Sequence, residues 1–225
     1  MLWRKAWFEC RFRLYLCLFL SATWWLASLA PNRRSVALPD YPAILIAAIL
    51  VPIGALLLGG SGINTQTSYG MTHGPHGSMY FLLSMPVARE KLLRIRAAFG
   101  FALLTLWVIA SIAAMSLNAK APDGGALAGI IPNLLAGAAL YYCFGVWLMS
   151  FLDEFWSGMI SMLATGVLAG YGMAQGPSWI NVPGFMMRSS LIGLEPIAWL
   201  QAAVYLAIAA TFYVSAWRVI ERKEY

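Results

Sequence analysis

The sequence predicts an all-α membrane protein with one transmembrane domain over residues 1–225, and two observations carry this prediction. Hydrophobic residues make up 61% of the chain and charged residues only 11%, less than half of the ~25% that is usual in a soluble domain. The apolar residues also gather in runs of roughly 20, the length that an α-helix needs to cross a bilayer. A membrane class is therefore favoured over a soluble one.

Six of these runs are predicted to be spanning helices. They lie at about 14–30, 41–60, 97–117, 126–151, 156–175 and 197–217. The linkers hold most of the Pro residues, and the charged residues all lie outside the six runs, as expected for chain outside the bilayer core. The first run continues into "PNRRS" rather than a small-residue cleavage site, so we expect it to remain as a span.

The distribution of basic residues predicts the orientation of the bundle. If both termini are cytoplasmic, eleven of the 15 Lys and Arg residues fall on the inner side and four on the outer side. Cytoplasmic loops of membrane proteins carry an excess of Lys and Arg. Both termini are therefore expected inside. The net charge of +6 then reflects orientation rather than nucleic-acid binding.

A compact charged segment separates the second and third runs. Five charges fall within eight residues: Arg89, Glu90, Lys91, Arg94 and Arg96. Each would cost about 2.5–3.5 kcal/mol at the centre of a spanning helix, so the segment is expected in the cytoplasm. One apolar stripe with helical spacing passes through it: Ala88, Leu92, Ile95 and Phe99. We expect a short amphipathic helix, starting near Pro86 and running into the third span, that either touches anionic lipid or docks a cytoplasmic protein.

The first 13 residues have a similar character. One helical face is apolar and carries Trp3, Ala6, Trp7 and Cys10, whereas Phe8 and Phe12 interrupt the other face. Most of the other face is charged, with Arg4, Lys5, Arg11 and Arg13. Trp and Arg together are typical of the membrane–water interface. An interfacial helix along the inner leaflet is therefore predicted over 1–13.

These features resemble the membrane subunit of an ABC transporter of the type-2 (exporter) permease family. The resemblance rests on "WRKAWFECRFR" at 3–13 and on "GSMYFLLSMPVAREKLLRIRAAFG" at 77–100. Within the second segment, "LLSMPVAR" is similar to the family's Leu-Leu-Ser-x-Pro-Val-Ser-Arg pattern. The chain departs from the family upstream, where "INTQTSYGMTHGPHG" replaces a stretch that is often acidic.

The resemblance implies a role for each of these segments. Residues 1–13 would be the elbow helix, and the 61–96 loop would contain the coupling helix that docks on a separate ATPase subunit. The ATPase contact would comprise Ser84, Met85, Pro86, Val87, Ala88, Arg89, Glu90 and Lys91. Residues 177–196 would be an extracytoplasmic segment with short re-entrant helices. The location would be the inner membrane of a prokaryote.

The sequence contains no nucleotide-binding motif. No GxxxxGK[ST] occurs, so ATP and Mg would be bound by the partner ATPase and no cofactor is expected in this chain. No charged residue lies well inside a predicted span, which argues against an ion-coupled carrier. Six spans suggest half of a pathway. A permease homodimer or heterodimer is therefore expected.

Several patterns point weakly to enzyme chemistry. "GGSG" at 59–62 places Ser61 before His73 and His76, but all three fall at a helix end or in a Gly-rich loop. The two His of "HGPHG" make a poor metal site. Asp153 and Glu154 are adjacent carboxylates that more often cap a loop or contact a basic partner patch, and we place them at the ATPase contact. No catalytic or metal site is predicted.

The remaining polar and thiol side chains favour packing roles. Candidate substrate contacts are Asn64, Thr65, Gln66, Tyr141, Tyr142 and Gln201, each more often a packing or interface residue. Cys10, Cys17 and Cys143 form no CxxC pair and are expected to be small core residues. The chain is thus expected to be a transport subunit and not an enzyme. The alternative is a non-transporting membrane anchor or regulator that recruits a cytoplasmic protein, and an intramembrane enzyme ranks last.

Overall fold

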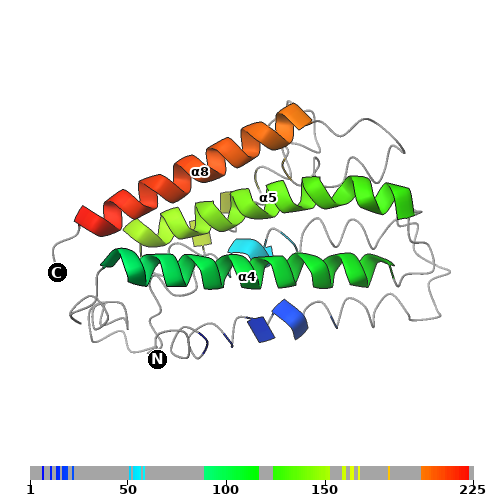
Figure 1. The fold of residues 1–225 in the computed structure, drawn as a ribbon, viewed down its shortest axis with the longest axis horizontal. Helices are drawn as coiled ribbons and strands as arrows, with labels where there is room; N and C mark the ends of the chain where they lie inside the picture. The colour runs from blue at the N-terminus through cyan, green and yellow to red at the C-terminus, as the bar shows by residue number, and fades with distance from the viewer. Residues whose placement is uncertain are drawn as a thin grey trace.

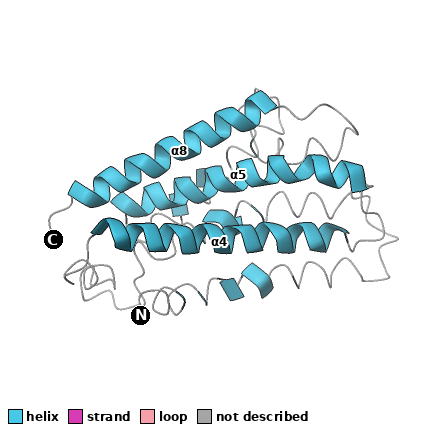
Figure 2. Ribbon diagram, in the orientation of Figure 1, coloured by secondary structure: helices cyan, strands magenta, loops and turns pink. Residues whose placement is uncertain are grey.

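The structure is a computed structural model that describes residues 89–116, 124–152 and 199–222. It also describes scattered positions within 7–22, 51–58 and 159–167, and residue 182. Every described residue except Leu152 is helical, so the predicted all-α class is confirmed for this part of the chain (Figure 2). Within the described residues, three helices run without a gap: α4 (Arg89–Ser116), α5 (Gly124–Phe151) and α8 (Trp199–Arg222).

These helices correspond to the third, fourth and sixth predicted runs. Two stretches are long and apolar enough to cross a membrane, Ile131–Phe151 in α5 and Leu200–Val219 in α8. A shorter apolar stretch, Ala97–Ala113, lies in α4. The runs at 14–30, 41–60 and 156–175, and the 177–196 segment, fall largely outside the described residues. The number of spans is therefore still a prediction.

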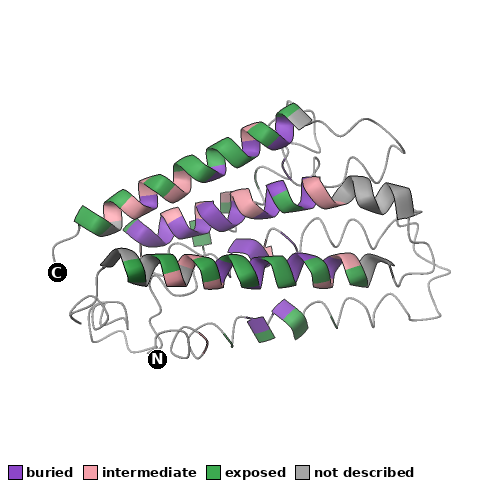
Figure 3. Cartoon of the chain, in the orientation of Figure 1, coloured by how far each residue is buried: buried purple, intermediate pink, exposed green. Residues whose placement is uncertain are grey.

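α5 lies between α4 and α8 (Figure 1). It packs against both neighbours, most extensively against α8. Its apolar stretch is 67% buried, whereas that of α8 is only 28% buried (Figure 3). α5 runs antiparallel to α4 and in the same direction as α8, so Arg89, Phe151 and Arg222 all mark the same end of the bundle. We call this the charged end.

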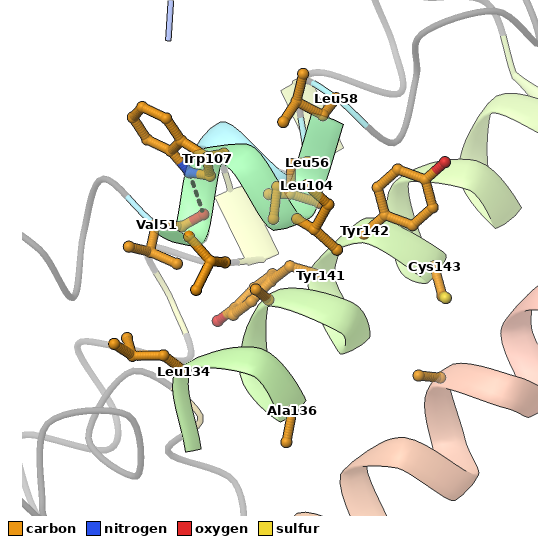
Figure 4. Close-up of a cluster of buried hydrophobic side chains, with 14 of the residues drawn as sticks. Val51, Leu56, Leu58, Leu104, Trp107, Leu134, Ala136, Tyr141, Tyr142 and Cys143 are labelled. Carbon is orange, nitrogen blue, oxygen red and sulfur yellow. Dashed lines mark hydrogen bonds between the residues drawn. The ribbon is translucent and has the colours of Figure 1, made fainter. Parts of the chain in front are cut away.

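The centre of the core joins α4 to the helical residues at 51–58. The Trp107 indole is 1% exposed and donates a hydrogen bond of 3.4 Å to the Val51 carbonyl (Figure 4). It lies directly over Gly54, where an added Cβ would come within 2.7 Å of the indole Cζ2. Only a residue without a side chain permits so close an approach of the ring to the facing backbone.

Hydroxyl groups in the apolar helices bond within their own helix. Thr105, Ser111 and Thr211 each donate to the carbonyl four residues earlier, at 2.9 Å. Thr105 and Thr211 are exposed, so these bonds satisfy hydroxyls on the outer surface of the bundle. Large apolar side chains also lie on that surface, among them Leu106 and Ile109 of α4. Such a surface suits contact with lipid, where polar groups must be satisfied internally.

Candidate functional site

The charged segment forms the first turns of α4 and is not a separate helix. α4 runs without a break from Arg89 through the charged turns to Ser116. Lys91 and Arg94 are exposed, whereas Ile95 and Phe99 are partly buried. The prediction of an amphipathic helix running into the third apolar run is thereby confirmed for these positions. Because the backbone is continuous, the charged turns and the apolar stretch are parts of one helical rod.

The structure describes only part of the predicted ATPase contact. The backbone of Arg89 and Glu90 is helical, but their side chains are not among the described parts of the structure. Ser84, Met85, Pro86, Val87 and Ala88 lie outside the described residues, as do Asp153 and Glu154. The last described bond of α5 is from the Leu152 amide to the Leu148 carbonyl, 2.9 Å, at the charged end.

The N-terminal segment contacts α4 just beyond its charged turns. The ring of Trp7 lies 6.2 Å from that of Phe99, nearly perpendicular to it, and 6.4 Å from that of Tyr15. Edge-to-face pairs of this kind are favourable beyond the apolar area that they bury. Arg11 is exposed. Trp3, Arg4, Lys5 and Arg13 of the predicted interfacial helix lie outside the described residues.

A second group of rings joins all three long helices. Phe101 of α4 lies 4.8 Å from Tyr142 of α5 and 6.0 Å from Tyr213 of α8, between ring centroids. Tyr142 also packs against Gly100, where an added Cβ would lie 2.9 Å from the phenol Cζ. The ring group therefore fixes where α4 and α8 meet beside α5.

A third group of rings fastens α5 to α8. Trp147 of α5 packs against Phe212 of α8 at 5.3 Å and donates a hydrogen bond of 3.2 Å to the Ser215 hydroxyl. Phe144 and Phe151 complete the group. Near the end of α8, Trp217 donates to the Glu221 carboxylate. The sequence alone did not point to these contacts, because an apolar run reveals its aromatic residues but not their facing partners.

The polar residues considered as substrate contacts are buried where they are described. Tyr141 and Tyr142 are 5% and 2% exposed, and Figure 4 shows them leaving α5 in different directions. Gln201 is 5% exposed and donates a hydrogen bond of 2.8 Å to Tyr205 on the same helix. These positions favour packing roles. Asn64, Thr65 and Gln66 lie outside the described residues.

Cys17 and Cys143 are buried and form no disulfide, as predicted for core residues. Cys10 lies outside the described residues, as do Ser61, His73 and His76. Within the described part of the chain, no group of three or more His, Cys, Asp or Glu side chains could hold a metal ion.

No family model, curated protein or solved structure matches this chain.

Proposed function

We propose that this chain is the membrane-spanning permease subunit of an ATP-driven ABC exporter. In this proposal it has six spanning helices, an N-terminal elbow helix, and a coupling helix at the start of α4. Two such subunits form the path, as a homodimer or a heterodimer. A separate ATPase subunit binds ATP and Mg and contacts the charged turns from the cytoplasmic side. The membrane is the inner membrane of a prokaryote.

The continuity of α4 is the observation that carries the proposal. Lys91 and Arg94 are exposed on the same helix that carries Trp107 into the core. A force applied to the charged turns would therefore move the core contact at Val51 and Gly54, because an α-helix has no joint along its length. A partner that closes around ATP could use this rod to shift the bundle.

Charges at the other described helix end support the orientation. Arg218, Glu221 and Arg222 are exposed at the charged end, together with Lys91 and Arg94 on α4. Basic residues gather on the cytoplasmic side of membrane proteins. We therefore assign the charged end to the cytoplasm, with both termini inside.

A charge reversal tests the partner contact. Arg89→Glu combined with Glu90→Lys should weaken co-purification of the candidate ATPase by at least about tenfold, because like charges would face the partner across the contact. The chain and the ATPase are co-expressed and purified in lipid, and ATP hydrolysis and transport are then measured. Membrane insertion of the variant should be unchanged.

The matched control reverses an adjacent acid–base pair at the end of α8, Glu221→Lys with Arg222→Glu. It should leave ATPase association intact. If assembly and coupling survive the α4 reversal, the contact assignment is wrong. An ATPase that never co-purifies contradicts the transporter proposal, and a complex that hydrolyses ATP but moves nothing favours the anchor or regulator.

A further inference from the structure

The outward side of α4 presents one continuous exposed face. Its members recur at three- and four-residue intervals, so they share one side of the helix. We call this the α4 outer face, made of Lys91, Arg94, Ala98, Phe101, Ala102, Thr105, Leu106 and Ile109. The opposite side carries Trp107 and the other core residues of α4.

The chemistry of the α4 outer face changes along the helix. It begins with two cations at the charged end, and no charged residue follows Arg96 in α4. Farther along, Phe101, Leu106 and Ile109 are 37%, 54% and 56% exposed. The Thr105 hydroxyl is bonded to the Phe101 carbonyl at 2.9 Å, so it adds no unsatisfied polar group. The face therefore passes from cationic to apolar within about three turns.

Aromatic rings border this face on both edges. Phe99 and Phe101 are two positions apart and so point to different sides of α4, about 200° from each other. Phe99 meets Trp7 of the N-terminal segment on one edge, and Phe101 meets Tyr213 of α8 on the other. The small side chains of Ala98 and Ala102 lie between these edges. A third exposed cation, Arg11, lies on the same segment as Trp7.

We propose that the α4 outer face binds one anionic phospholipid of the inner leaflet. Lys91 and Arg94 hold the phosphate headgroup, and an acyl chain lies along Ala98 and Ala102 between the two pairs of rings. Opposite charge selects the headgroup, and the uncharged continuation of the face suits a hydrocarbon chain. A soluble acidic peptide would match the cations but not the apolar length. The proposal rests on the membrane part of the proposed function. Lys91 also belongs to the proposed ATPase contact, so the test uses the chain without the ATPase.

Native mass spectrometry of the full-length chain, released from detergent micelles, tests this binding. The probes are phosphatidylglycerol and phosphatidylcholine with identical acyl chains, and soluble glycerophosphoglycerol. We expect retention of phosphatidylglycerol over phosphatidylcholine by about thirtyfold, because each basic residue contributes about fivefold to binding of an anionic surface. A diazirine on the acyl chain of phosphatidylglycerol should label α4 between residues 98 and 109.

The Lys91→Gln, Arg94→Gln variant should lose this preference almost completely. The control is Arg218→Gln with Arg222→Gln, which removes two cations from the same end of the bundle and should keep it. Three results would each overturn the proposal. The wild type could retain both lipids equally, the control could lose the preference for phosphatidylglycerol as fully as the Lys91, Arg94 variant does, or glycerophosphoglycerol could bind as tightly as phosphatidylglycerol.

Carbonate extraction of the membranes distinguishes a failure of the lipid site from a failure of the proposed function. A chain that is extracted overturns the membrane part of the proposed function and the lipid site together. A chain that stays inserted but shows no preference for the anionic lipid overturns the lipid site alone. Circular dichroism confirms that each variant keeps its helix content.

Discussion

Single residues decide how closely the helices approach. Gly54 accepts the Trp107 indole against its backbone, and Gly100 does the same for the Tyr142 phenol. Both rings are almost fully buried, at 1% and 2% exposed. A large ring that occupies the space of a missing side chain gives a contact of high area between two helices. These pairs are specific to the register in which the helices meet.

Gly54→Ala should destabilise the protein by about 1–3 kcal/mol, because its methyl group would overlap the indole and displace a fully buried ring. The hydrogen bond from Trp107 to Val51 should be lost with it. The measurement is the thermal unfolding midpoint in detergent micelles, followed by the reactivity of buried thiols. In a Trp107→Phe background, Gly54→Ala should lower the unfolding midpoint much less than it does in the wild type. Additive effects of the two changes would contradict the contact.

At the scale of elements, α4 combines a charged start with a long apolar stretch. The sequence predicts a short amphipathic helix that runs into the third span, and the structure has both parts in one helix of 28 residues. The sequence contains the reason, because no Pro or turn residue separates Arg96 from Phe101 apart from the single Gly100. One glycine weakens a helix without ending it.

Ala97→Pro should break this continuity at a cost of about 3 kcal/mol, because proline lacks the amide hydrogen and clashes with the preceding turn. Hydrogen exchange should then accelerate in residues 89–96, while residues 101–109 stay protected. Ala97→Ser occupies the same position without breaking the backbone bonds and should exchange as the wild type does. Unchanged exchange in the Pro variant would show that the two parts of α4 are already uncoupled.

At the scale of the whole molecule, the charges of α4 and α8 gather at one end. Lys91 and Arg94 on α4 and Arg218, Glu221 and Arg222 on α8 lie at the charged end, although more than 120 residues of sequence separate the two groups. The described remainder of these two helices is uncharged. An asymmetry of this kind orients a helical bundle across a bilayer.

Single cysteines should report this orientation when Cys10, Cys17 and Cys143 are replaced by Ala. Lys91→Cys and Arg222→Cys should react with a membrane-impermeant maleimide in inverted vesicles and not in intact cells. Gly124→Cys, at the opposite end of α5, should react in intact cells. Labelling of Lys91→Cys and Arg222→Cys from different sides would contradict the arrangement of Figure 1.

The sequence by itself determined the helical class, the approximate positions of three helices and the amphipathic start of α4. Composition and periodicity carry this information because the hydration energy of each side chain and the helical repeat of about 3.6 residues depend on nearby residues in the sequence. Only the tertiary structure decided that Trp7 meets Phe99, that Phe101 meets Tyr142 and Tyr213, and that Trp107 lies over Gly54. Ring pairs between distant segments depend on how helices pack side by side. In an almost uniformly apolar sequence, no polar pattern distinguishes the face that packs from the face that meets lipid.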